Sequence, residues 1–287
     1  MKIFNGKSYS QKIAEELKEE VSYLKSAPKL VVISVGSDAA SMTYIKSKKK
    51  MADFIGINLE HTTFPENISE DVLEECIEKY NSDKTVSGII VQLPLPKHLN
   101  ASKISSVISS DKDVDGFSLT NMGKLCLNQP HFIPCTPSGI LEILKSYNYD
   151  VSGKSVVIIG RSNIVGKPLA LELINLGATV TVCNSNTDKT HLKSLCLFAD
   201  VVIVATGCPN TVNYHYVKYA EMVIDVGINR LEDGKLVGDV NFDSLLNHGF
   251  KGVVTPVPGG VGLMTVANLM KNTVLAYKLQ HLKKGEL

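Results

Sequence analysis

The sequence predicts an α/β fold of two domains, each built on a parallel β-sheet. Short apolar segments of strand length alternate with amphipathic segments of helix length, a pattern typical of parallel strands joined by helical crossovers. The alternation runs through the first third of the chain and starts again near residue 155. A chain of 287 residues suits two domains of ordinary size or a single large one.

The first series follows a charged helical pattern at residues 11–26. Ser69 is placed to cap one of its helices, because a serine hydroxyl accepts a hydrogen bond from an N–H of the first turn, and acidic residues follow it. The expected strands are 30–35, 57–63 and 87–92, and the expected helices are 39–55 and 69–80.

The second series opens with the most distinctive segment, residues 155–183. An apolar strand runs into Gly160, a polar turn follows, and a helix runs from Gly166 to Gly177 before a strand at 179–183. A helix that begins directly after a parallel strand offers unpaired N–H groups and a positive dipole end to a pyrophosphate. The turn has fewer glycines than the usual G-x-G-x-x-G pattern, so a purely structural crossover stays open as an alternative.

The rest of the second series is less distinctive. Further strands are expected at 199–205 and 222–226, and helices at 136–147 and 264–282. The domain boundary is expected between residues 120 and 150. Periodicity alone does not assign the last helix to either domain.

The residues after the strand 179–183 bear on the choice of dinucleotide. An Asp or Glu usually binds the ribose 2′-OH of NAD there, whereas Asn184, Ser185 and Asn186 come first in this chain. Arg161, in the turn, is one of two arginines beside 28 lysines, and the arginine fork suits a phosphate group. We therefore predict NADP as the cofactor, with NAD as the less favoured alternative.

Composition narrows the classes of partner. A net charge of +1 gives no overall field that would attract nucleic acid or an anionic membrane, and no apolar run is long enough to span a bilayer. The six cysteines form no C-x-x-C pair, which favours reduced thiols. With no hydrophobic signal core at the N-terminus, we expect a cytoplasmic protein with a small-molecule substrate and no metal.

Two patterns are candidates for chemistry in the first domain. Tyr44 and Lys48 stand one turn apart on a helix face, and in a dry site such a phenol can help to lower the pKa of the amine for proton transfer. In a lysine-rich chain this spacing is also common on a solvated face. Gln92 ends a strand before two prolines, at the edge where parallel sheets bind ligands, although a rigid turn explains it equally well.

Two further segments are candidate ligand contacts. The segment 111–117, DKDVDGF, lacks the glycine and glutamate positions of a calcium loop. One of its carboxylates could bind the N–H donors of a nitrogen-rich heterocycle, and a simple turn at Gly116 is the alternative. The segment 255–262, TPVPGGVG, combines fixed φ angles with residues that lack a Cβ, which favours close approach of backbone to a ligand over a hinge.

Taken in order, these segments resemble the methylenetetrahydrofolate dehydrogenase/cyclohydrolase family over essentially the whole chain. The matching pieces are ASMTYIKSK, VQLPLP, DKDVDGF, PCTPSGILEIL, GRSNIVGKP, ADVVIVATG, VIDVGIN and TPVPGGVG. The resemblance implies a folate-binding catalytic domain of residues 1–120 with the C-terminal helix 264–287, and a Rossmann-type NADP-binding domain of residues 121–263. It also implies a cleft between the domains and a homodimer.

The resemblance further implies two activities. NADP-dependent oxidation would convert 5,10-methylenetetrahydrofolate to 5,10-methenyltetrahydrofolate, and hydrolysis would then give 10-formyltetrahydrofolate for one-carbon metabolism and purine biosynthesis. Lys48 would be the catalytic lysine beside Tyr44, Gln92 would hydrogen-bond to it, and Asp115 would hold the pterin ring. The other implied substrate contacts are Val91, Leu93, Pro258, Gly259, Gly260, Val261 and Gly262. The implied cofactor contacts are Gly160, Arg161, Ser162, Ser185 and Ile228.

The sequence departs from the family pattern at three places. Leu263 stands where proline is usual, Ser118-Leu119 replaces His-Pro, and Asn186 replaces a basic residue common beside the 2′-phosphate. The alternative functions are a folate dehydrogenase without cyclohydrolase activity, a non-catalytic NADP- or folate-binding module, and a short-chain dehydrogenase. In the last class the Tyr-x-x-x-Lys pair follows the glycine-rich turn, whereas here it precedes that turn.

Overall fold

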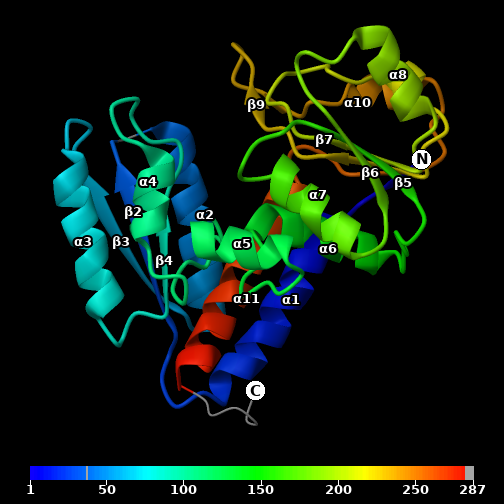
Figure 1. The fold of residues 1–287 in the computed structure, drawn as a ribbon. Coiled ribbons are helices and arrows are strands. Elements are labelled where there is room, and N and C mark those ends of the chain that lie inside the picture. The colour runs from blue at the N-terminus through cyan, green and yellow to red at the C-terminus, as the bar shows by residue number, and fades with distance from the viewer. Residues whose placement is uncertain (37, 282–287) are drawn as a thin grey trace. The chain divides into compact units, whose positions relative to one another are not determined.

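The computed structural model describes residues 1–36 and 38–281, which form two compact units (Figure 1). Unit 1 comprises Met1–Ser10 and Thr136–Thr265, and unit 2 comprises Gln11–Cys135 and the chain from Val266 onward. Each unit contains a parallel sheet packed with helices. The predicted α/β fold class is confirmed.

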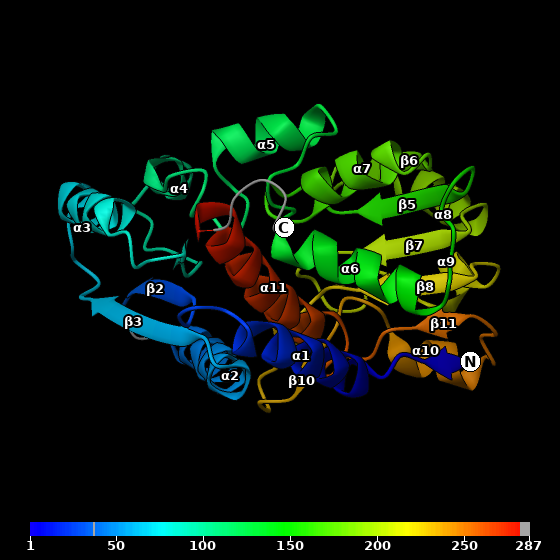
Figure 2. The ribbon, with the colours of Figure 1, turned by 90° about the horizontal axis from the view of Figure 1, so that it is seen from below.

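Unit 2 has a three-stranded parallel sheet in the order β3-β2-β4. Its helices α3 and α4 lie on one side of the sheet and α2 on the other (Figure 2). The alternating side chains of β2 are buried on both faces, as a covered parallel sheet requires. The strands are β2 (Lys29–Val35), β3 (Asn58–Phe64) and β4 (Gly88–Val91), and the helices are α2 (Ala39–Ile55), α3 (Glu70–Ser82), α4 (Ala101–Val107) and α5 (Leu119–Cys126).

Two long helices each begin in unit 1 and end in unit 2. Helix α1 (Gly6–Ser22) passes from unit 1 to unit 2 after Ser10, and α11 (Val261–His281) does so after Thr265. Inside unit 2 the two helices are joined by the Lys278–Glu20 ion pair at 2.6 Å. Helix α11 corresponds to the last predicted helix, 264–282, and begins three residues earlier, at Val261. The predicted end at residue 282 lies outside the described residues.

Unit 1 has a six-stranded parallel sheet in the order β1-β11-β8-β7-β5-β6. Helices α6 and α7 lie against one face, and α8, α9 and α10 against the other (Figures 1 and 2). Chain order reverses at β5, which has β6 on one side and β7 on the other. The sheet strands are β1 (Lys2–Ile3), β5 (Ser155–Ile159), β6 (Thr179–Cys183), β7 (Val201–Val204), β8 (Met222–Asp225) and β11 (Val253–Val254). The helices are α6 (Cys135–Ser146), α7 (Gly166–Asn175), α8 (Lys189–Leu197), α9 (Tyr214–Val217) and α10 (Phe242–Asn247), and β9 (Asn229–Arg230) and β10 (Leu236–Val237) form an antiparallel pair.

Most predicted elements are present, with ends that differ by a few residues. Helix α2 and strand β6 have the predicted bounds, and Ser69 caps α3 by accepting the N–H of Val72 at 3.5 Å. Strand β4 is shorter than the predicted strand 87–92. None of the helices within 1–36 and 38–281 is long and apolar enough to cross a bilayer.

The edge strand β1 is an element that sequence analysis did not predict. The Lys2 N–H donates to Gly252 O and the Phe4 N–H to Val254 O, both at 2.9 Å, so the first residues extend the sheet of unit 1. The compact units of the structure change over at residues 10, 135 and 265, and residue 135 lies within the range 120–150 expected for the boundary. Two-residue strands have no alternation from which they could be predicted.

Candidate active site

Helix α2 presents the Tyr44 and Lys48 side chains. Its N-terminus is capped by Asp38, whose side chain accepts the Ser41 N–H at 2.7 Å, and it ends at Gly56 with φ of 95°. Ile45 is 4% exposed and packs on the inner side of the helix. This packing sets the rotation of the helix, and both Tyr44 and Lys48 are left partly buried.

The Lys48 amine and the Gln92 amide form the central contact of unit 2. Lys48 Nζ donates to Gln92 Oε1 at 2.8 Å. Gln92 Nε2 donates to Leu93 O at 2.7 Å, which turns the amide oxygen toward the lysine. The Gln92 N–H also donates to Ile33 O at 2.7 Å, so the side chain starts from backbone attached to the sheet. Residues from two elements 44 positions apart thus meet at the carboxyl end of β4.

Burial dominates the electrostatics of this group. It lowers the pKa of the Lys48 amine, and the nearby Asp115 and Cys135 partly oppose that shift. Burial also raises the pKa of the Asp115 carboxyl, against the effect of Lys48. The Tyr44 phenol has a raised pKa for the same reason. An amine whose pKa is lowered in this way can exchange protons nearer to neutral pH than a solvated lysine can.

The three acids of the segment 111–117 have different roles. Asp111 is exposed, whereas Asp113 is 1% exposed and its carboxylate accepts backbone N–H groups of the turn. Gly116 donates to Asp113 Oδ1 at 3.0 Å and Ser118 to Asp113 Oδ2 at 2.7 Å. Asp113 therefore shapes the turn, and Asp115 is the acid that stands beside Lys48.

Cys135 is a further residue of the candidate site, which sequence analysis did not single out. Its thiol donates to Val114 O at 3.3 Å and lies within hydrogen-bonding distance of the Asp115 carboxyl. Burial and the neighbouring Asp115 raise the pKa of this thiol well above its usual value, so it stays protonated and can donate. The cysteine stands in one of the segments that matched the family, but its apolar context indicated only a buried thiol.

The turn after β5 is compact and presents exposed polar side chains. Gly160 has φ of 127°, and a Cβ there would lie 2.2 Å from Ala205 O. A Cβ on Gly166 would lie 2.1 Å from Gly160 O. Both glycines are required for the chain to turn directly into α7. Ser162 Oγ accepts the N–H of Val165 at 3.1 Å, and Arg161 is exposed at the carboxyl end of the sheet, where its order reverses.

The end of β6 offers polar groups without a free carboxylate. Ser185 and Asn186 are exposed, and Asn184 Oδ1 accepts the Asn186 N–H at 3.0 Å. The Asp188 carboxylate caps α8 by accepting the N–H groups of Thr190 and His191 at 2.9 and 3.0 Å. Asp188, the first acid after β6, therefore already accepts hydrogen bonds from the backbone of α8. Arg161 in the turn after β5 and the Ser185 hydroxyl suit a dinucleotide that carries a phosphate on its ribose.

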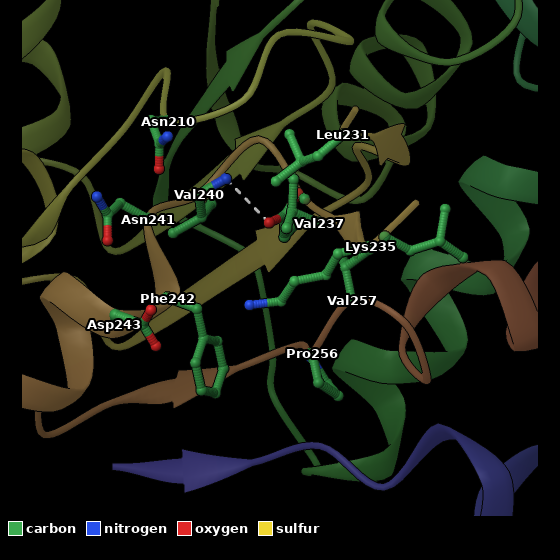
Figure 3. Close-up of a pocket in the computed structure, with 13 residues that line it drawn as sticks. Asn210, Leu231, Lys235, Val237, Val240, Asn241, Phe242, Asp243, Pro256 and Val257 are labelled. Carbon is green, nitrogen blue, oxygen red and sulfur yellow. Dashed lines mark hydrogen bonds between the residues drawn. The ribbon is translucent and has the colours of Figure 1, made fainter. Parts of the chain in front are cut away.

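A cavity of about 490 Å³ lies beyond the carboxyl ends of β8 and β11 in unit 1 (Figure 3). The β9–β10 pair contributes Lys235 and Val237, and Phe242 and Pro256 form apolar walls. The Asp225 carboxylate, which also lines the cavity, accepts the Val240 N–H at 2.9 Å, the bond dashed in Figure 3. Within the described residues no three His, Cys, Asp or Glu side chains gather as metal ligands.

Comparison with known proteins identifies the family. The model of the tetrahydrofolate dehydrogenase/cyclohydrolase catalytic domain matches residues 4–115, and that of the NAD(P)-binding domain of the same family matches residues 134–281. The chain belongs to the tetrahydrofolate dehydrogenase/cyclohydrolase family.

Individual members of the family match nearly the full length. The chain is 50% identical over 282 residues to a protein named "Bifunctional protein FolD" from Acetivibrio thermocellus, covering 97% of this chain and 98% of the relative. The bifunctional FolD structure from Campylobacter jejuni superposes with a TM-score of 0.93 at 47% identity, covering 97% and 99% of the two chains. The Trypanosoma brucei FolD structure, in complex with NADP and an inhibitor, has a TM-score of 0.92 at 34% identity and covers 98% of both chains.

Within this family member, the residues predicted for the site fall in both units. Unit 2 contains Tyr44, Lys48, Val91, Gln92, Leu93 and Asp115. Unit 1 contains Gly160, Arg161, Ser162, Ser185, Ile228 and the stretch Pro258, Gly259, Gly260, Val261 and Gly262. Unit 2 brings Lys48, Gln92 and Asp115 together, while Ile228 is 44% exposed in unit 1.

One departure from the family pattern has a structural reason. Ser118 is the N-cap of α5, since its hydroxyl accepts the Asn121 N–H at 3.3 Å. Leu119, the first residue of that helix, is 75% exposed. The Ser-Leu pair therefore serves the start of a helix, in which serine is a favoured cap.

Proposed function

We propose that this protein is a bifunctional folate enzyme. It oxidises 5,10-methylenetetrahydrofolate with NADP to 5,10-methenyltetrahydrofolate and hydrolyses that product to 10-formyltetrahydrofolate. The observation that carries the proposal is the Lys48–Gln92 hydrogen bond of 2.8 Å, beside Asp115, in a setting that lowers the pKa of the amine. Family membership and the bifunctional relatives support both activities.

The turn after β5 is the proposed cofactor site. NADP, when bound, accepts the hydride that leaves the methylene carbon of the folate. We propose that Arg161 and Ser185 bind the 2′-phosphate, that Gly160 and Ser162 contact the remainder of the cofactor, and that Ile228 lies against it. The bonded state of Asp188 supports NADP over NAD, because that acid is not available to a free 2′-OH.

The group around Lys48 is the proposed site of hydrolysis. Water adds to the methenyl carbon and must lose a proton, and a neutral Lys48 amine can accept it and later return it as the ring C–N bond breaks. Gln92 holds the amine through its oxygen, and Asp115 accepts N–H groups of the pterin ring. Tyr44 lines the same helix face, and Val91, Leu93 and the stretch Pro258, Gly259, Gly260, Val261 and Gly262 are proposed to contact the folate.

We also propose a homodimer located in the cytoplasm, with 10-formyltetrahydrofolate supplied to purine biosynthesis. The six cysteines are free thiols, which supports a reducing compartment. Light scattering of the purified protein tests the oligomeric state directly, and a monomeric mass would reject the dimer.

A product analysis tests the function. Purified protein is incubated with 5,10-methylenetetrahydrofolate and either NADP or NAD, and the products are separated. NADPH with 10-formyltetrahydrofolate is the expected result. Accumulation of the methenyl product alone would mean a dehydrogenase without cyclohydrolase activity, and a preference for NAD would reject the assigned cofactor. No reduced cofactor would overturn the whole proposal.

A further inference from the structure

The last helix contributes one buried amide to the segments around Lys48. Asn272 of α11 is 7% exposed, and its Nδ2 donates to Val114 O at 2.8 Å and to Ile133 O at 3.0 Å. Val114 directly precedes Asp115, and Ile133 lies two residues before Cys135. The two hydrogens of one amide therefore join two stretches of backbone, each of which bears a residue of the candidate site.

The two stretches lie in close contact at this point. The Cys135 thiol donates to the same Val114 carbonyl at 3.3 Å, and a Cβ on Gly116 would lie 3.1 Å from Phe132 O. Loss of the amide would leave the buried Val114 carbonyl and the partly buried Ile133 carbonyl without this donor, and an unpaired buried carbonyl costs more free energy than the bond itself contributes. The expected response is a shift of one stretch against the other, or entry of water between them.

The surroundings of Asn272 distinguish positioning from simple packing. Its neighbours Leu269, Met270 and Ala276 on α11 are at most 1% exposed, so this part of the helix is buried. An apolar side chain would meet the needs of packing there without the desolvation cost of an amide. The amide, in contrast, makes directional hydrogen bonds that fix the positions of the Val114 and Ile133 carbonyls.

We propose that Asn272 is a positioning residue of the folate site, because it sets where the Asp115 carboxyl stands relative to the Lys48 amine and the Cys135 thiol. This inference rests on the proposed function, since it assigns the effect to folate binding. Asn272 acts through the backbone, because its amide holds the Val114 carbonyl and Val114 positions the next residue, Asp115. No contact between Asn272 and the substrate is required.

The test is the Asn272→Ala variant, with KM measured separately for methylenetetrahydrofolate and for NADP. We expect the folate KM to rise about tenfold or more, as the loss of one to two buried hydrogen bonds predicts. The NADP KM should stay within about twofold, because the proposed cofactor residues belong to unit 1. The folate KM of Asn272→Ser, which keeps one hydroxyl donor, should lie between those of Asn272→Ala and the wild type. Asn272→Ser replaces Asn272→Ala as the test if the alanine variant fails to fold.

Gln280→Ala is the matched control on the same helix. Gln280 Nε2 donates to Ser87 O at 2.9 Å and Asp111 O at 3.0 Å, so the variant loses the same number of amide–carbonyl bonds. These acceptors do not adjoin Asp115. We expect a smaller fall in melting temperature than for Asn272→Ala, because Gln280 is only partly buried, and an unchanged folate KM. Equal kinetic effects in the two variants would reduce Asn272 to a purely structural residue and overturn the proposal.

A double-mutant cycle checks that the effect passes through Asp115. Affinity for tetrahydrofolate is measured by calorimetry for the wild type, Asn272→Ala, Asp115→Asn and the double variant. If Asn272 acts by placing the Asp115 carboxyl, its substitution should cost less than about twofold in affinity once that carboxyl is absent. A full effect in the Asp115→Asn background contradicts the proposal. Because the cycle measures binding, it is independent of turnover, whose absence in the wild type would overturn the proposed function instead.

Discussion

The Asp225 carboxylate accepts the backbone N–H of Asp239 at 2.9 Å and so joins the end of β8 to the chain that follows β10. The Asp239 carboxylate in turn accepts the Thr206 N–H beyond β7 at 2.6 Å. Both acids are at most 4% exposed. A Cβ on Gly227, two residues after Asp225, would clash with the Asp239 carboxylate. A Cβ on Gly238, directly before Asp239, would clash with the Asp225 carboxylate. This reciprocal arrangement joins the segments that follow β7, β8 and β10 at the carboxyl ends of β7 and β8.

The pair predicts a pH-dependent contribution to stability. Burial raises the pKa of Asp225 to about 6, although the N–H groups of Val240 and Asp239 oppose the shift. The folded state therefore binds a proton that the unfolded state releases near pH 4. This contribution is fully present below the unfolded pKa and is lost as pH rises through about 6.

The measurement is the free energy of unfolding of the wild type and Asp225→Asn between pH 4 and pH 7. Asp225→Asn is less stable throughout, because its NH2 group meets backbone donors, but the gap to the wild type should narrow as pH rises. A gap that is constant with pH, or that widens, contradicts the assigned pKa.

Lys48→Met should abolish hydrolysis and leave the fold intact. We expect cyclohydrolase activity to fall by roughly 10²–10⁴-fold, as loss of a general acid–base group predicts.

The same variant should change how stability depends on pH. Because burial lowers the pKa of the Lys48 amine, the folded wild type binds fewer protons than its unfolded state. The free energy of unfolding of the wild type therefore increases as pH rises toward the pKa of an unfolded lysine. The variant lacks this gain, so its stability relative to the wild type should be highest near neutral pH and decline toward pH ~10.

Lys46→Met, an exposed position on the same helix, is the control for that experiment. It should retain both activities. Normal cyclohydrolase turnover in Lys48→Met would reject the assigned role of the lysine.

Arg161→Gln tests the cofactor assignment. An arginine that binds a phosphate through charge-assisted hydrogen bonds contributes about 1.5–3 kcal/mol, so the NADP KM should rise by roughly 10–150-fold while the NAD KM changes little. Arg230→Gln is the matched control, since the other arginine donates to Gly234 O at 3.1 Å within the β9–β10 pair. Equal losses for NADP and NAD would show that Arg161 does not bind the 2′-phosphate.

Gly6→Ala tests the packing of the PGGVG stretch. A Cβ on Gly6, at the start of α1, would lie 2.3 Å from Gly259 O and 2.9 Å from Gly260 O. These are backbone atoms that cannot rotate away, so we expect a loss of about 1–3 kcal/mol in the free energy of unfolding. The folate KM should rise as well if Gly259 and Gly260 contact the substrate.

Gly123→Ala serves as the reference substitution. Gly123 lies inside α5 with open space at its Cβ position, so alanine should stabilise by about 0.5–1 kcal/mol through helix propensity. Chemical unfolding of both variants distinguishes the clash from a general glycine effect, and a Gly6→Ala protein as stable as the wild type would refute the close approach.

Much of the fold was predictable because the relevant pattern is local. The apolar run from Ser155 to Ile159, the glycine turn and the leucines of α7 each impose a backbone conformation through neighbours a few residues away. The same is true of α2, whose capping residues adjoin it in sequence. The two-residue strands β1 and β11 were not predictable, since they exist only through pairing with each other and with β8.

The candidate site divides in the same way. Tyr44 and Lys48 share a helix face by spacing alone, and Gln92 ends a predicted strand where parallel sheets bind ligands. The family resemblance pointed to Asp115. The sequence by itself determined the family and the α/β fold, and it predicted residues for the candidate site. Only the tertiary structure decided that Asp113 shapes the turn, that Cys135 stands beside Asp115, and that Asn272 joins the two. The physical reason is distance along the chain: the Asn272 amide meets Val114 across 158 residues, and hydrogen bonds of that kind leave no periodic trace in the sequence.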